Sequence, residues 1–376
     1  MDFSVRLNSS GWCSLFVTEL NENGTELDKN LHVSRCMFWS MFSSEAVVCI
    51  LGVIFLALCL LSSIVNGCTL LGLGRSHDLS WEPRFAILKS LIISDMLFTL
   101  TQGLTVLHCL LHRRTLAFGT WCLAQYFVGT ICIFCALLTI TMMAVERYLY
   151  VCHAIHYLNI VTVRRRQLAV GVVWLLSVSI ASTNMLLLLC LGHSKFGTAT
   201  AGLLCEPDTI ERHMGFPRAA AVFRKTTGVG LTLLCILIYS FSYRRMYQEA
   251  RNAVEPFHHA NTRAHRTVLF YGSMFILQLV PCLAKIVSDA FWEFKGTEAM
   301  MAPLPSPSPF SPYEVLPSHS LGALHISLLV LLFVPPCINP LIYGIRNLEV
   351  RQSLLRLCRY RHLRQLFPIG KEETLS

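Results

Sequence analysis

Long apolar stretches separated by short polar ones run through the chain. Seven of them approach the length of about 20 apolar residues that an α-helix needs to cross a bilayer. They lie at 47–73, 85–111, 122–149, 167–191, 224–246, 267–293 and 321–344. This pattern predicts an all-α membrane protein, a bundle of seven transmembrane helices over 46–346.

A few polar residues interrupt these spans. The second span contains Lys89 and Asp95, and the sixth contains Lys285 and Asp289. A charge in hydrocarbon is costly unless it is paired or faces protein or a cavity, so we expect Asp95 to join an internal polar network. Lys285 and Asp289 are four residues apart and would either pair with each other or face a ligand. Asn66, in the first span, would either face the bundle or be satisfied locally.

Composition and charge support a membrane protein. The chain is 54% hydrophobic and 14% charged, whereas soluble domains carry about 25% charged residues. The formal net charge is +9, but the basic residues gather beside the apolar spans. That arrangement is typical of membrane topology and argues against a nucleic-acid partner.

The same charges predict the orientation of the chain. Basic residues are most abundant after the third, fifth and seventh spans, which places the C-terminus in the cytoplasm. The N-terminal tail, 1–45, is then extracellular, at the plasma membrane. Asn8 and Asn23 open Asn-x-Ser/Thr sequences there, so both are predicted glycosylation sites. The first 40 residues lack an apolar run, so we predict no cleavable signal peptide.

Two segments outside the spans have a distinct composition. The predicted extracellular loop 296–320 is rich in Pro and Ser, which favours extended chain. The end of the chain, 347–376, begins with a basic amphipathic pattern that predicts a short helix on the inner leaflet, followed by a cytoplasmic tail. Cys358 in that helix is a candidate for palmitoylation.

Most of the 16 cysteines lie in apolar spans, where cysteine usually acts as a packing residue. The exceptions on the predicted outer side are Cys13, Cys36, Cys122 and Cys205. Disulfides form in that oxidising compartment. Whether Cys13 pairs with Cys36 or with another outer cysteine stays open.

Two short motifs mark the inner ends of spans. Glu146-Arg147-Tyr148 closes the third span, and Asn339-Pro340-Leu341-Ile342-Tyr343 lies near the end of the seventh. Cys122 opens the third span 25 residues before Arg147, a distance of about 37 Å along a helix. Cys122 and Arg147 therefore mark opposite ends of one helix.

Together these residues resemble the rhodopsin-like (class A) G-protein-coupled receptors, over about 45–360. The markers that fall on successive spans are Asn66, Asp95, Cys122, Glu146-Arg147-Tyr148, Trp174 and Asn339-Pro340-Leu341-Ile342-Tyr343. The stretches 143–157 and 339–347 are similar to signatures of vertebrate odorant receptors, and more to the fish type than to the mammalian consensus. Glu146 stands in place of the usual Asp of this signature, and Ala154 in place of a Pro.

The resemblance implies a disulfide between Cys122 and Cys205 and a switch at the inner end. Glu146 would hold Arg147 until activation frees it for a heterotrimeric G protein. Pro340 would mark a kink that changes, and Tyr343 would swing inward. The other residues implied in this switch are Tyr148, Asn66 and a water network shared by Asp95 and Asn339.

The resemblance also implies an outer cavity for a small extracellular ligand. By helical position, its lining is Tyr126, Thr130, Ile133, Phe134, Thr227, Lys285, Asp289 and His325. Gly129 stands where amine receptors have an aspartate, so no amine counter-ion is expected. We expect weak or no sodium binding, no cofactor and no metal.

The favoured interpretation is an odorant receptor that activates a G protein. A non-olfactory rhodopsin-like receptor for a peptide or lipid is the alternative. A transporter or channel is less favoured, because the two halves show no internal repeat. The chain contains none of the short catalytic motifs of hydrolases or phosphate-binding enzymes, so we do not expect an enzyme.

Overall fold

The computed structural model describes residues 26–252, 272–288 and 319–346, with gaps at 43, 76–83, 154, 194–195, 201 and 274. Several predictions lie outside these residues. They are the glycosylation sites Asn8 and Asn23, the cysteine Cys13, the pocket residue Asp289, the loop 296–320, and the tail 347–376 with Cys358.

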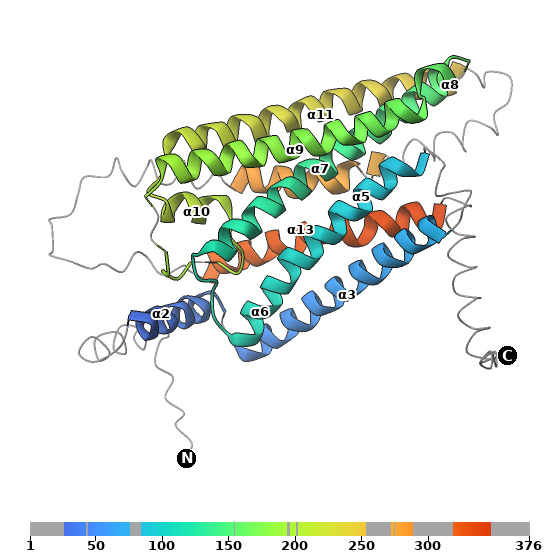
Figure 1. Ribbon diagram of the computed structural model, residues 1–376. Helices are drawn as coiled ribbons and strands as arrows, with labels where there is room; N and C mark the ends of the chain where they lie inside the picture. Colours follow the sequence, from blue (N-terminus) through green and yellow to red (C-terminus); the bar gives the residue numbers. More distant parts are fainter. Residues whose placement is uncertain are drawn as a thin grey trace, which may run out of the picture.

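The molecule is a bundle of long helices (Figure 1). Among the residues that the structure describes, six helices are long and apolar enough to cross a membrane. Phe275–Ser288 is a shorter apolar helix, and it is here called the sixth helix because it lies in the predicted sixth span. The long elements are α3 (Glu45–Arg75), α5 (Arg84–Phe98), α6 (Leu104–His112), α7 (Thr120–Cys152), α9 (Val163–Leu191), α11 (Arg218–Asn252) and α13 (His319–Arg346). The predicted seven-helix, all-α fold is confirmed.

Helix α7 occupies the centre of this bundle. It contacts α5, α9 and α11 along its length. Helices α9 and α11 lie on its outer side (Figure 1) and expose large apolar side chains such as Leu175 and Leu237. In a membrane protein such side chains face lipid, because the lipid tails are as apolar as they are.

The second span consists of two α-helices joined by a π-helical turn. The turn, η1 (Thr99–Gly103), separates α5 from α6 and buries Thr99 and Gln102. Arg113 then ends α6 in the left-handed conformation, with φ 52°. π-Helical turns are often found at functional sites, and the apolar pattern of 85–111 carries no sign of this one.

The predicted N-terminal tail contains a helix that is part of the folded structure. Helix α2 (Glu26–Met41) lies across one end of the bundle (Figure 1). Phe38, Met41 and Phe42 are buried in one apolar cluster with residues of α3, α6 and α13. The predicted tail 1–45 thus includes a helix, and the apolar residues of that helix pack against the bundle. Cys36 in this helix is disulfide-bonded.

Helix α13 passes through three prolines, Pro335, Pro336 and Pro340. Proline has no N–H, so Pro340 cannot donate to the carbonyl four residues earlier. That carbonyl belongs to Pro336, and it accepts a hydrogen bond from the Asn66 amide at 3.0 Å. A side chain of α3 thus replaces the helical hydrogen bond that Pro340 removes.

Candidate functional site

Cys122 and Cys205 form a disulfide at one end of the bundle, here called the disulfide end. Cys122 opens α7, and Cys205 lies in the connection 192–217 between α9 and α11. The short helices α2 and α10 (Pro207–His213) lie at this end, and α8 (Tyr157–Ile160) lies at the other (Figure 1). The bond ties the connection to α7 and is the pairing that the resemblance implies.

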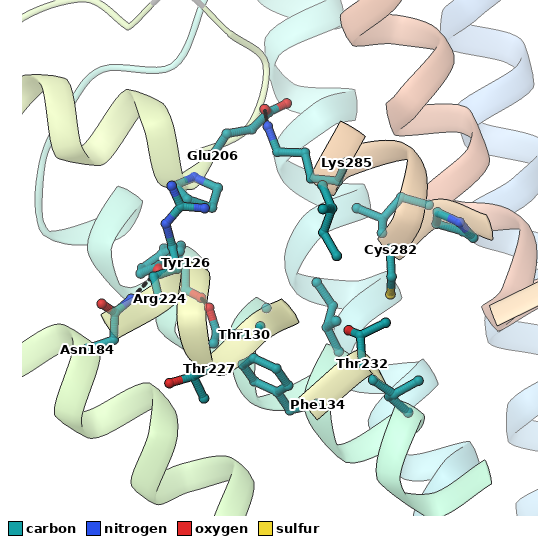
Figure 2. Close-up of a pocket in the computed structure, with 18 of the residues that line it drawn as sticks. Tyr126, Thr130, Phe134, Asn184, Glu206, Arg224, Thr227, Thr232, Cys282 and Lys285 are labelled. Atoms are coloured by element: carbon teal, nitrogen blue, oxygen red, sulfur yellow. Dashed lines mark hydrogen bonds and ion pairs between the residues drawn. The ribbon is translucent and has the colours of Figure 1, made fainter. Parts of the chain in front are cut away.

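A cavity of about 360 Å³ lies beneath this connection. Side chains of α7, α11, the sixth helix and α13 surround it, and most of the lining is apolar. Its volume is within the range of about 300–1,000 Å³ found for small-molecule pockets. The polar groups shown in Figure 2 reach it from several helices.

Six of the eight residues predicted for the pocket line this cavity. They are Tyr126, Thr130, Ile133, Phe134, Thr227 and Lys285. His325 does not line the cavity. Its Nδ1 atom lies 2.6 Å from the carboxylate of Glu206, which is a lining residue. Asp289 lies outside the described residues.

Gly129 leaves space in the cavity wall for a side chain of the π-helical turn. A Cβ atom at Gly129 would lie 2.5 Å from Nε2 of Gln102. The same Nε2 donates a hydrogen bond to the backbone oxygen of Gln125 at 2.9 Å. A side chain at this position would therefore push the end of Gln102 away from that hydrogen bond. Gly129 is also the position at which no amine counter-ion is expected.

We expect Gly129→Ala to lower the free energy of unfolding by about 1–2 kcal/mol, because overpacking displaces Gln102 from its hydrogen bond. The matched control is Gly228→Ala, at a cavity-lining glycine where a Cβ would meet nothing within 4 Å. The control should be neutral or slightly stabilising. Thermal unfolding of the purified protein compares the two variants, and equal unfolding temperatures would contradict this role of Gly129.

Charged residues converge above the cavity, at its mouth. Lys285 lies 2.6 Å from Oε2 of Glu206 and 3.2 Å from Asp208. Arg224 lies 2.7 Å from Glu211 and 3.1 Å from Asp208. These pairs join α11 and the sixth helix to the connection 192–217, and Figure 2 shows Glu206 and Lys285 pointing toward each other.

The surroundings of Glu206 determine its protonation. Burial alone would raise its pKa, but His325 and Lys285 together hold that pKa well below the usual range. A lowered folded-state pKa means that the unfolded chain binds the proton more tightly. The carboxylate therefore stabilises the fold above about pH 4.3, and this contribution is lost only as the pH falls toward the lowered value.

A second polar cluster lies in the middle of the bundle. Asn339 donates to Asp95 at 3.2 Å. The Asn339 amide also lies 3.5 Å from Gln278, and Ser62 is hydrogen-bonded to Thr99. The structure thus brings Asp95 and Asn339 into direct contact, where the sequence analysis expected them to share a water network.

At the opposite end of α7 lies Glu146-Arg147-Tyr148. Glu146 lies 3.3 Å from Nε of Arg166 and accepts a hydrogen bond from the Tyr157 hydroxyl at 3.1 Å. Arg166 donates to the same hydroxyl at 2.8 Å. The proposed pairing of Glu146 with Arg147 stays a prediction. The side chain of Tyr343 lies outside the described residues.

Several residues of both sites could not be recognised from the sequence. Arg166 belongs to the run Arg164-Arg165-Arg166, whose charges suggested exposed cytoplasmic chain, yet its side chain is only 6% exposed. Glu206 directly follows Cys205, and its position beside the predicted disulfide was the one feature of the sequence that could have placed it near the cavity. Asn184 and Gln102 line the cavity from α9 and the π-helical turn and carried no signal in the sequence.

Comparison with known proteins places the chain in a family. The family described as "7 transmembrane receptor (rhodopsin family)" matches residues 65–343. The chain therefore belongs to the rhodopsin family of seven-transmembrane receptors. It is a multi-pass membrane protein and a signalling receptor, not an enzyme, and the family implies an extracellular ligand and a G-protein partner.

Individual relatives are more distant. Human olfactory receptor 2AG2 is 26% identical over 307 residues, which cover 81% of this chain and 87% of that receptor. Human olfactory receptor 2A12 is 25% identical over 363 residues, which cover 91% of this chain and 96% of that receptor. Rat neurotensin receptor type 1 is 27% identical over 158 residues, which cover 41% of this chain and 37% of that receptor. These matches do not confirm the prediction that the chain is more similar to fish-type odorant receptors than to the mammalian consensus.

Proposed function

We propose that this protein is an odorant receptor of the plasma membrane. A small extracellular molecule binds in the cavity at the disulfide end, and a heterotrimeric G protein binds at the end that carries Arg147. The N-terminus is extracellular in this arrangement. The observation that carries the proposal is the mostly apolar cavity of about 360 Å³ with a few polar groups, a combination suited to small organic ligands.

The relatives agree with this proposal. The matches to olfactory receptors 2AG2 and 2A12 extend over 81% and 91% of the chain. The second candidate is a receptor for a non-odorant ligand such as a peptide or lipid, and the match to rat neurotensin receptor type 1 is the observation in its favour. That match covers 41% of the chain, so we rank it second.

The test is cyclic-AMP accumulation in cells that express the chain with an olfactory-type stimulatory G protein, screened against small odorants. We expect a ligand response that Arg147→Ala abolishes while surface expression is retained, because Arg147 is the residue proposed to meet the G protein. Arg164→Ala, at an exposed arginine of the same end, is the control and should keep the response.

A silent but well-expressed receptor would count against the odorant proposal. Coupling to other G proteins would then be measured with peptide and lipid ligands, where a response favours the second candidate. Silence there as well would indicate a non-signalling role.

A further inference from the structure

The mouth of the cavity contains a carboxylate that belongs to the protein itself. Each oxygen of Glu206 faces a different basic side chain. Oε1 lies 2.6 Å from Nδ1 of His325, and Oε2 lies 2.6 Å from Nζ of Lys285. Glu206 thus bridges α13 and the sixth helix in the way that a bound carboxylic acid would.

The backbone around Glu206 fixes this position. Cys205, immediately before it, is bonded to Cys122, and Pro207, immediately after it, is the first residue of α10. The preceding Leu203 N–H lies 3.4 Å from Nε2 of His325, and Cys205 N–H lies 3.4 Å from Oε1 of Gln125. The carboxylate is therefore held by a disulfide, a helix start and contacts to two transmembrane helices.

The other charges of the lining are engaged too. Arg224 is paired with Glu211 and Asp208, and Lys225 has a contact of its own. An acidic ligand that enters this cavity would have to displace Glu206 before it reached Lys285. Removing one partner of a largely desolvated ion pair is costly, since the other charge is left uncompensated.

We propose that Glu206 is a specificity-determining residue, which fills the carboxylate position between Lys285 and His325 and so restricts the cavity to uncharged ligands. The inference rests on the proposed function, because it concerns the ligand of the same cavity. Specificity of this kind comes from a cost imposed on the wrong ligand as well as from contacts with the right one.

Glu206→Gln tests this idea by a gain of binding. The amide keeps the shape of the side chain and removes the nearer of the two carboxylate charges that pair with Lys285. The probes are octanol and octanoate, which share a chain length and differ in charge. We expect the wild type to respond to octanol at least about tenfold more sensitively than to octanoate, and the variant to gain at least about tenfold in sensitivity to octanoate, an energy of about 1.4 kcal/mol.

Two further variants make the test specific. Asp208→Asn removes a neighbouring, half-exposed carboxylate that lies farther from Lys285, and should produce a much smaller gain. Glu206→Gln combined with Lys285→Met should lose the gain, because the ammonium group proposed to bind the ligand carboxylate is gone. Surface expression is measured for each variant, and Glu206→Asp, with an intermediate gain expected, replaces Glu206→Gln if the latter does not reach the surface.

A second readout separates this inference from the proposed function. Octanoate should raise the unfolding temperature of the purified Glu206→Gln receptor and leave that of the wild type unchanged, whether or not any G protein responds. A wild type that binds octanoate as well as octanol, a folded variant with no gain, or a gain that persists without Lys285 would each overturn the inference. If cyclic AMP stays constant while octanoate stabilises only the variant, the inference stands and the proposed coupling fails.

Discussion

Replacing either Cys122 or Cys205 by serine should destabilise the receptor by about 2–5 kcal/mol and remove most of it from the cell surface. The bond closes a loop of 83 residues in sequence separation, which the unfolded chain explores freely once the bond is gone. In the folded protein it also positions Glu206, so the mouth of the cavity should loosen. The two single variants and the double variant should show the same defect, since each lacks the same bond.

Surface immunodetection and thermal unfolding of the purified receptor measure this effect. Cys190→Ser is the matched control, because Cys190 is a free, exposed cysteine near the end of α9. It should unfold at the temperature of the wild type. Wild-type surface levels and unfolding temperature in Cys122→Ser would show that the bond is dispensable.

Arg166→Met should lower the free energy of unfolding by about 3–5 kcal/mol, because it removes one partner of a buried ion pair. The side chains of Arg166 and Glu146 are 6% and 16% exposed, so water screens their attraction weakly. The substitution also removes the hydrogen bond that Arg166 donates to Tyr157. Three elements, α7, α8 and α9, should therefore lose their shared contact.

A double-mutant cycle isolates the pair. Glu146→Gln with Arg166→Met leaves no buried charge from the pair, so the double variant should be more stable than Arg166→Met alone. Arg164→Met, an exposed neighbour in the same turn of α9, should change stability by less than about 0.5 kcal/mol. Equal losses for Arg164→Met and Arg166→Met would contradict the pairing.

The spans were predictable because length and apolar composition suffice to identify a transmembrane helix. Part of the cavity lining on α7 was predictable too, since side chains at known offsets from Cys122 on one helix share a face. Tyr126, Thr130, Ile133 and Phe134 follow this rule. In both cases the deciding interactions are local in sequence.

The features that escaped prediction depend on contacts between distant segments. Lys285 and Glu206 are 79 residues apart in the chain, and no local pattern reports that their side chains meet. The π-helical turn Thr99–Gly103 has an ordinary composition, and close packing of Gly103 against Cys59 accompanies it. Helix α2 could not be recognised because its apolar residues are few, and they are buried in a cluster with residues that are distant in the sequence, from α3, α6 and α13.

The hydrogen bond from Asn66 to the Pro336 carbonyl has an evolutionary consequence. In a descendant that exchanged Pro340 for a residue with a backbone N–H, the carbonyl would regain its helical donor. Asn66 would then share this acceptor with the helical donor, while its amide keeps the hydrogen bonds to the carbonyl and hydroxyl oxygens of Ser62 at 2.9 and 3.0 Å. Asn66 should therefore be kept in relatives that carry Pro340, and be free to vary in lineages that lose the proline.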